Sequence, residues 1–443
     1  MGYEKLTFAN GVYEGDAVDG KPNGKGKYTY KSGSVYEGSF VNGKLHGKGK
    51  KSYADGSVHE GDFVNGELQG QVKMTFKDGD VYEGGYLNGK PHGKGKSFKH
   101  VTDNWELAYE GDYVNGLHHG KGKWSYSLGV YEGDWVRGEM QGKGKITHKN
   151  GDVSEGEFFK GNQQGRGKYT FANGDVYEGH FNLGSRAGHG KLTYADGDVY
   201  SGDFLFNKFH GKGKFTWADG DSYEGDFIEG IKTGKGKYTW PNGDIYDGDW
   251  AEGKRTGKGR MTYTEGFIVF YEGDFVDGKK TGKGKMKTAN GITYEGDFVD
   301  GKWHGKGKMT GPDGGEYEGD FDKDRMHGKG KLTNKNGDVF ECYFDNDNMI
   351  RGKLTYSDGA VFTGTFEDGQ PHGKGKKICA DGGVYEGDFV EGAFHGKGRI
   401  TFKNGDFYDG DFANGTFHGK GKIKCPDGVV REGIFNKGEL MDQ

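Results

Sequence analysis

Nine histidines stand immediately before a Gly-Lys-Gly sequence. Histidine is a common metal ligand, and several histidines close together can form a metal site. The nine histidines are His46, His92, His119, His210, His304, His327, His372, His395 and His418. A metal ion needs its ligands about 2 Å from one centre. Equivalent positions in successive two-stranded units of a sheet lie roughly 10 Å apart. We therefore interpret each histidine as a loop residue whose side chain forms a hydrogen bond that closes the loop. We expect no metal site.

Two other patterns resemble binding motifs without meeting their requirements. Calcium needs six or more oxygens within about 2.6 Å, and a spaced row of aspartates after Asn-Gly or Asp-Gly turns does not supply them. A phosphate-binding loop requires a glycine five residues before its Gly-Lys-Ser, but Lys90 stands there relative to Gly95-Lys96-Ser97. The abundant carboxylates each have a lysine partner and no evident pocket. We expect no cofactor and no enzymatic activity.

A repeating unit positions all of these residues. Tyr-Glu-Gly or a degenerate form of it starts nineteen times, and fourteen of the eighteen intervals are 23 residues. A period of this length is typical of solenoids and arrays. The starts are Tyr13, Tyr36, His59, Tyr82, Tyr109, Tyr131, Ser154, Tyr177, Tyr200, Tyr223, Tyr246, Tyr271, Tyr294, Tyr317, Phe340, Phe362, Tyr385, Tyr408 and Arg431. We assign residues 1–12 to an N-terminal half-repeat or cap, 13–430 to eighteen tandem repeats and 431–443 to a partial C-terminal repeat.

Each unit reads as a β-hairpin. In the copy at Tyr36, side chains alternate up to Phe40, residues 41–46 contain Asn-Gly, and alternation then resumes. Pairing Tyr36 with Lys51 places Glu37 opposite Lys50 and Gly38 opposite Gly49, and it places Phe40 opposite Gly47. This register predicts a Glu–Lys pair on one face and aromatic rings over paired glycines on the other. We expect an all-β fold, an elongated single twisted antiparallel sheet of tandem 23-residue hairpins.

These residues carry a family resemblance. Tyr-Glu-Gly followed by Asn/Asp-Gly-Lys-x-His-Gly-x-Gly resembles the MORN repeat (membrane occupation and recognition nexus), and the resemblance covers essentially the whole chain. It implies an extended ribbon of hairpins that serves as a scaffold, tether or dimerisation module. Relatives occur in ciliary radial-spoke heads, junctional membrane proteins, protist cytoskeletal collars and lipid kinases.

Composition limits the partners. Basic and acidic residues number 62 and 67, for a net charge of −5, so the chain as a whole has no drive towards nucleic acid or membrane. We expect no nucleic-acid partner. The sequence shows no signal-peptide core and no transmembrane run, and its cysteine spacing favours a reducing compartment. We expect a cytoplasmic protein that associates with the cytoskeleton or with a membrane.

Departures from the repeat pattern are the candidate contact sites. Two consecutive repeats replace the loop histidine by threonine and double the basic residues. These loops and their neighbours give a candidate patch for anionic lipid or an acidic partner, formed by Lys232, Lys254, Arg255, Lys279, Lys280 and Trp303. A solvated charged edge is the alternative interpretation. Trp105 lies in a four-residue insertion and is either a partner contact or a local staple over a bulge.

The C-terminal repeats carry apolar residues at loop positions, beside a strand that lacks its hairpin partner. An open strand edge next to exposed apolar side chains predicts self-association into a homodimer. The candidate edge is Phe394, Phe417, Ile434, Phe435 and Leu440. The alternative is that the last residues fold back and cover the edge.

Three functions fit these features. The first is a non-enzymatic scaffold with protein partners in a cytoskeletal or ciliary/flagellar assembly. The second is a phosphoinositide-dependent membrane tether that binds anionic phospholipid. The third, regulation of an enzyme partner, rests on analogy alone.

Overall fold

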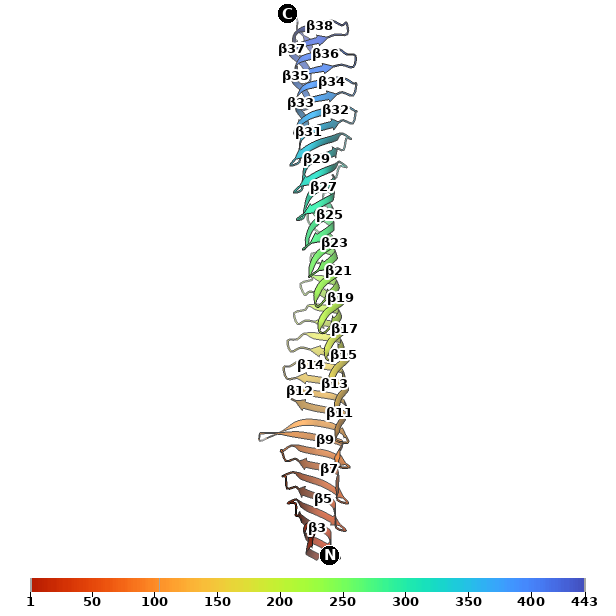
Figure 1. The fold of residues 1–443 in the computed structure, drawn as a ribbon, viewed down its shortest axis with the longest axis vertical. Coiled ribbons are helices and arrows are strands. Elements are labelled where there is room, and N and C mark those ends of the chain that lie inside the picture. Colours follow the sequence, from red (N-terminus) through yellow and green to blue (C-terminus); the bar gives the residue numbers. More distant parts are fainter. Residues whose placement is uncertain (1, 103, 442–443) are drawn as a thin grey trace. The chain divides into compact units, whose positions relative to one another are not determined.

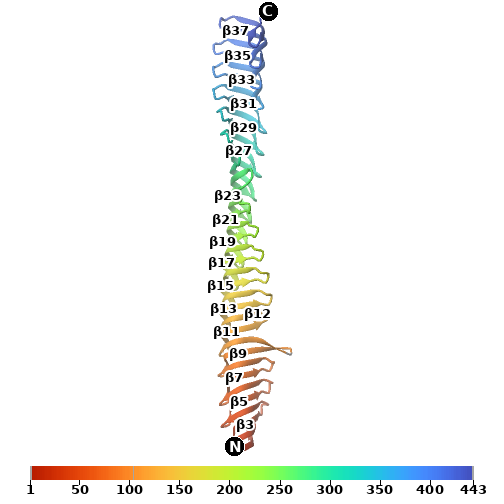
Figure 2. The same ribbon diagram turned by 180° about the vertical axis from the view of Figure 1, so that it is seen from behind.

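The computed structural model describes residues 2–102 and 104–441, and every regular element in these residues is a β-strand. The chain divides into two units, residues 1–218 with 228–230 and residues 219–227 with 231–443. Within each unit, strands that follow one another in the chain pair antiparallel (Figures 1 and 2). The prediction of an all-β antiparallel sheet of hairpin repeats is confirmed.

The strands are short and nearly equal in length, as expected of one repeated hairpin. The first unit contains β1 (Gly2–Phe8), β2 (Gly11–Val18), β3 (Lys21–Tyr30), β4 (Val35–Val41), β5 (Lys44–Ser52), β6 (Val58–Val64), β7 (Glu67–Thr75), β8 (Val81–Leu87), β9 (Lys90–Val101), β10 (Asn104–Val114), β11 (Leu117–Tyr126), β12 (Gly129–Val136), β13 (Glu139–His148), β14 (Val153–Phe159), β15 (Asn162–Thr170), β16 (Val176–Asn182), β17 (Ser185–Thr193), β18 (Val199–Leu205) and β19 (Lys208–Thr216). At the division of the units lies β20 (Ser222–Ile228). The second unit contains β21 (Ile231–Thr239), β22 (Ile245–Ala251), β23 (Lys254–Thr262), β24 (Ile268–Val276), β25 (Lys279–Thr288), β26 (Thr293–Val299), β27 (Lys302–Thr310), β28 (Glu316–Asp322), β29 (Arg325–Thr333), β30 (Val339–Asp345), β31 (Asn348–Thr355), β32 (Val361–Glu367), β33 (Gln370–Ile378), β34 (Val384–Val390), β35 (Ala393–Thr401), β36 (Phe407–Ala413), β37 (Thr416–Lys424), β38 (Val430–Asn436) and β39 (Glu439–Leu440).

The register of the hairpin is as predicted in its first half and different in its second. In the copy at Tyr36, β4 and β5 pair Tyr36 with Lys51 and Gly38 with Gly49. Past Gly38 the register shifts, and Phe40 faces Leu45. The predicted pairing of Phe40 with Gly47 is therefore wrong. Phe40 instead faces a glycine of the preceding repeat, Gly24.

A tight turn followed by a bulge causes this shift. Asn42 and Gly43 have φ angles of 48° and 79°, which is the type I′ geometry that matches the twist of a two-residue hairpin. Between the pairs Gly38–Gly49 and Phe40–Leu45, β4 has one residue and β5 has three, so the bulge adds two residues to β5. Gly47 lies in this bulge with a φ of +65°. The six-residue loop expected at 41–46 is thus a two-residue turn, next to which Val41 pairs with Lys44 and Phe40 pairs with Leu45.

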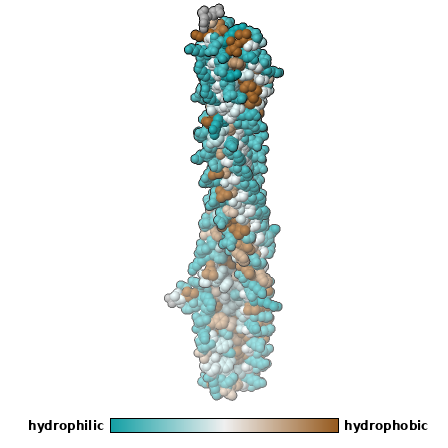
Figure 3. Space-filling model, turned by 45° about the horizontal axis from the view of Figure 1, so that its top comes forward, coloured by the Kyte–Doolittle hydropathy of each residue, from teal (hydrophilic) through white to brown (hydrophobic). Residues whose placement is uncertain are grey.

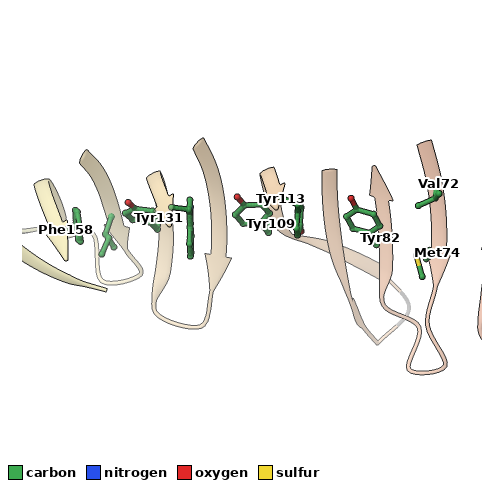
Figure 4. Close-up of a cluster of buried hydrophobic side chains, with 9 residues drawn as sticks. Val72, Met74, Tyr82, Tyr109, Tyr113, Tyr131 and Phe158 are labelled. Carbon is green, nitrogen blue, oxygen red and sulfur yellow. The ribbon is translucent and has the colours of Figure 1, made fainter. Parts of the chain in front are cut away.

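Aromatic rings form the core on one face of each unit. In the second unit, the ring of Tyr294 makes edge contacts with Phe298 of its own repeat at 5.2 Å and with Phe321 of the next at 5.0 Å. The Tyr294 hydroxyl donates a hydrogen bond to the carbonyl of Asp297 at 2.9 Å. The same arrangement recurs in the first unit (Figure 4) around Tyr82, Tyr109 and Tyr131. Because each tyrosine contacts two repeats, the core runs from one repeat into the next.

One hairpin departs from the common length. Strands β9 and β10 have twelve and eleven residues, and they extend beyond their neighbours as the long hairpin seen in Figure 1. This is the four-residue insertion recognised in the sequence.

Candidate interaction surfaces

The face opposite the rings carries an outer row of alternating glutamates and lysines. Lys50 Nζ lies 2.8 Å from Oε1 of Glu60 in the next repeat, although its register partner within its own hairpin is Glu37. Lys27 bridges to Glu37 in the same way at 2.8 Å. The predicted Glu37–Lys50 register is confirmed, but the ion pairs join neighbouring repeats. Each exposed pair contributes little alone, so the row mainly sets how successive repeats align.

An inner row of aspartates and lysines runs beside the outer row. Asp388 Oδ1 lies 2.6 Å from Lys374 Nζ of the preceding repeat, and its Oδ2 accepts a hydrogen bond from the Lys397 backbone N–H at 3.1 Å. The hydrogen bond from Lys374 is the main reason that the pKa of Asp388 is lowered. The aspartate therefore joins the bulge of its own hairpin to the preceding repeat.

Between these rows each unit has an open groove. In the second unit the groove has a volume of about 2450 Å³ and is lined by residues from Lys235 in β21 to Thr365 in β32. In the first unit a groove of about 1160 Å³ extends from Lys25 in β3 to Gly122 in β11. Both have glycine backbone as the floor and charged side chains as the walls. Such a surface suits an extended, polar segment of a partner.

No cluster of three or more His, Cys, Asp or Glu residues fit to hold a metal ion occurs in residues 2–102 and 104–441. The same residues include no helix that meets the length and hydropathy needed to cross a bilayer. Figure 3 shows that hydrophilic side chains, drawn in teal, cover most of the visible surface.

In repeats that begin with tyrosine, one register position covers the tyrosine ring, as Trp303 and Phe394 do. It lies directly across the hairpin from the core phenylalanine or tryptophan, and we call it the cover position. Arg255 faces Trp250, Lys280 faces Phe275, and Trp303 faces Phe298. The sequence predicts a loop at these residues, because the register expected there contains no bulge.

Cations at the cover position lie over aromatic rings. Lys232 Nζ is 4.5 Å from the ring centre of Tyr238 and 5.3 Å from that of Trp250. Burial lowers the pKa of Lys232, and it also lowers the pKa of Lys280. Cation–π contacts of this kind stabilise a fold when the cation is partly desolvated. These two lysines therefore stabilise the aromatic core.

The other lysines of the predicted patch stand at exposed turns. Lys254 pairs with Asp277 at 3.1 Å and Lys279 pairs with Asp300 at 2.9 Å. Binding of anionic lipid or of an acidic partner at this patch stays a prediction, and Lys254 and Lys279 are its accessible members.

A family model of the MORN repeat matches seventeen segments of the chain, more than half of its length. The segments are residues 13–35, 36–58, 59–81, 82–97, 109–127, 131–153, 155–176, 177–199, 200–222, 223–245, 246–267, 271–293, 294–316, 317–339, 362–384, 385–407 and 408–430. The chain belongs to the MORN-repeat family. The predicted resemblance is confirmed, and MORN repeats are a class that mediates interaction with proteins or membranes. The copy at 340–361 is not matched as a MORN repeat.

This MORN-repeat chain shares little sequence with the solved structures that it resembles. No match is found among curated proteins. The TCP domain of Drosophila melanogaster SAS-4 in complex with a proline-rich motif of Ana2 is 13% identical, covering 40% of this chain and 88% of that one, with a TM-score of 0.24. The TCP10 domain of Danio rerio CPAP is 12% identical, covering 55% and 99%, with a TM-score of 0.20. Scores this low support no argument about function.

The two off-pattern tryptophans of the MORN array have different surroundings. Trp303 is 9% exposed and stacks on Tyr294 with ring centres 4.4 Å apart. Its proposed role as a binding anchor is wrong, because its cover position places it in the core. Trp105 is 55% exposed, and its Nε1 donates a hydrogen bond to the Gly79 carbonyl at 2.7 Å. A partner contact at Trp105 stays a prediction.

The predicted C-terminal edge is mostly core. Phe394 stacks on Tyr385 at 3.8 Å and Phe417 on Tyr408 at 4.0 Å. The expectation that these two rings are exposed is wrong, for the same reason as at Trp303. Phe435 is buried, whereas Ile434 and Leu440 are exposed. Strand β39 pairs with Phe435 and Asn436 of β38, and the Met441 backbone N–H donates a hydrogen bond to the Ile434 carbonyl at 2.9 Å. Self-association there stays a prediction.

Proposed function

We propose that this MORN-repeat protein is a non-enzymatic scaffold that binds protein partners in a cytoskeletal or ciliary/flagellar assembly. The observation that supports it best is the groove between the charged rows of each unit. In the second unit the groove draws its walls from twelve successive strands, β21 to β32. A surface built by repetition offers many weak, equivalent contacts to a long partner.

The scaffold proposal has a direct test in the cells that express the protein. The chain is tagged at either end, the cells are extracted with non-ionic detergent, and neighbours are identified by proximity labelling. We expect the tagged protein in the insoluble cytoskeletal or axonemal fraction, with structural proteins as its neighbours. A protein that is released completely by detergent and labels only soluble enzymes would contradict the scaffold.

A phosphoinositide-dependent membrane tether is a second candidate. It is favoured by the exposed lysines at successive turns, Lys254 and Lys279. We propose flotation with vesicles that contain phosphatidylinositol bisphosphate, comparing the natural chain with the K254E/K279E variant. Loss of flotation in the variant supports the tether, because each lysine-to-glutamate change replaces attraction to anionic lipid by repulsion. Equal flotation of both proteins removes this patch from consideration.

Self-association is a separate proposal. Ile434 is 59% exposed on the charged face, and it stands where the preceding repeats carry Asp388 and Asp411. An apolar residue in that row favours contact with a second copy. Light scattering of the full chain and of the I434D variant tests it: a dimeric natural chain with a monomeric variant supports contact here, and a monomeric natural chain refutes it.

A further inference from the structure

The inner charged row of the second unit is interrupted at one place. Row lysines before and after this place bond to an aspartate of the next repeat: Lys306 lies 2.5 Å from Asp320, and Lys374 lies 2.6 Å from Asp388. Between them, Lys329 stands opposite Tyr343 of the next repeat, and Arg351 stands opposite Thr365 of the repeat after that. Neither can accept a charge-paired bond as a carboxylate does.

The outer row is interrupted at the same place. Thr363 stands where most repeats carry glutamate, and Lys353 turns back to Glu341 of its own hairpin at 3.5 Å. Three of the four acidic positions in the repeats at Phe340 and Phe362 are therefore occupied by neutral residues. No other pair of consecutive repeats in the sequence lacks more than two. Cationic side chains of the inner row here thus lack, among the described residues, the carboxylate partners that Lys306 and Lys374 have on either side.

The backbone differs here as well. The hairpin of β30 and β31 has its bulge between Tyr343 and Phe344, one residue later than the bulge after Gly319 in the preceding repeat. Cys342 occupies the place of the row glycine opposite Gly330 and Gly352. This is also the copy that the MORN family model does not match. The change in charge therefore belongs to a repeat that departs from the pattern in length and backbone, rather than to isolated substitutions.

The interrupted residues line the groove and are accessible from it. Lys329, Tyr343, Arg351, Thr363 and Thr365 all border the 2450 Å³ groove. All five are exposed, and in the described residues Lys329 and Arg351 take part in no ion pair within 4.0 Å. We name these five residues the cationic window.

We propose that the cationic window is the docking point for an acidic, extended segment of a protein partner. Lys329 and Arg351 lie two strands apart, a spacing of about 10 Å. An extended chain in the polyproline II conformation has three residues per turn and rises about 3.1 Å per residue, so carboxylates three residues apart project to the same side about 9 Å apart. The guanidinium of Arg351 offers a bidentate site for one carboxylate, and the neighbouring Tyr343 ring and threonine hydroxyls offer further contacts. This inference rests on the proposed function, because it names the chemistry of the partner that the scaffold groove receives.

The experiment restores the missing acidic residues of the inner charged row. The Y343D/T365D variant of the full chain places aspartate where most other repeats carry an acid, so it supplies Lys329 and Arg351 with partners from within the protein. Binding of a fluorescein-labelled oligoglutamate peptide is measured by anisotropy at low salt, with oligoglutamine as the neutral control probe. We expect binding of oligoglutamate to the natural chain and a loss of affinity of at least about fivefold in the variant, from two charge contacts.

A matched control separates the window from net charge. The S39D/H180D variant adds the same two negative charges at equivalent row positions in the first unit, opposite Lys25 and Arg166. We expect it to bind oligoglutamate as the natural chain does. A second pair of variants guards against a folding defect: K329Q/R351Q should weaken binding, and K306Q/K397Q, which removes two cations that are paired within the row, should weaken it less.

Several results would overturn the proposal. They are no binding of oligoglutamate by the natural chain, equal loss in Y343D/T365D and S39D/H180D, and binding that persists above about 300 mM salt, where exposed charges are screened. Binding of inorganic phosphate or of phosphoinositide vesicles at the window, with no binding of the peptide, would assign the site to another ligand. If the window fails while the tagged protein still fractionates with the cytoskeleton, the scaffold stands without it. If oligoglutamate binds but the protein is soluble in cells, the scaffold fails and the window stands.

Discussion

The ring of Tyr294 occupies the space where Gly307 would carry a side chain. A Cβ placed on Gly307 would lie 2.4 Å from Cε2 of Tyr294, far closer than two carbon atoms approach without repulsion. Gly307 has extended backbone, so the need for glycine here is steric. The prediction that rings cover paired glycines is confirmed at this contact.

The G307A variant should therefore be destabilised. Adding one methyl group beneath a packed ring costs about 1–3 kcal/mol, and we expect faster amide exchange in β26 and β27 together with a lower unfolding midpoint. The control is G315A, because the nearest atom to a Cβ at Gly315 would be Oδ1 of Asp313, at 3.3 Å. Equal stability of G307A and G315A would contradict the packing described here.

The chain should lose stability in alkali. Burial raises the pKa of Tyr36 from its ordinary value of 10.0 to about 12, and burial also raises the pKa of Tyr294. A raised folded-state pKa means that the stabilisation is complete below pH 10 and is lost as the pH rises through 12. Tyrosinate absorbance and circular dichroism, recorded together against pH, should change at the same pH. Ionisation of all tyrosines near pH 10 with the sheet intact would contradict this prediction.

Trp303 and Trp105 should respond differently to truncation. W303A removes a buried ring and should cost about 3–5 kcal/mol, whereas W105A should change the unfolding free energy little because Trp105 is exposed. The informative variant is W303F, since the buried Nε1 of Trp303 has no hydrogen-bond partner among the described residues. Phenylalanine stands at the cover position in other repeats, at Phe394 and Phe417.

We expect W303F to be at least as stable as the natural chain, because it removes an unsatisfied buried donor. Chemical denaturation of the three variants measures the differences. A W303F variant as unstable as W303A would show that the indole itself is required.

A turn residue offers a route to stabilisation. Leu183 has a φ of 48° and is 69% exposed, and a left-handed backbone costs a branched residue about 1–2 kcal/mol relative to asparagine or glycine. We expect L183N to raise the unfolding midpoint. The reciprocal change, N42L, places leucine at the equivalent φ of 48° in another repeat and should lower it. A lower midpoint for L183N together with a higher midpoint for N42L, measured by thermal unfolding, would contradict the turn geometry.

The sequence alone was enough to predict the repeat, its hairpin and the register of its first half. Alternation places Tyr36, Gly38 and Phe40 on one face, and a one-residue slip would bury charges among rings. The period of 23 residues and the recurring motif predicted the MORN family in the same way. These features are local, because each depends on residues close together in the chain.

The tertiary structure decided what each hairpin does with its neighbours. The bulge at Gly47, and its counterparts in other repeats, move the cover position from the expected loop into the core. Trp303 and Lys280 therefore contact tyrosine rings. Adjacent repeats compete for the same side chain, and Lys50 bonds to Glu60 although Glu37 also faces it. The cationic window was missed for a related reason. Its signal, neutral residues at acidic row positions, is visible only when successive repeats are aligned on the paired strands, because a charge is balanced by the repeat beside it.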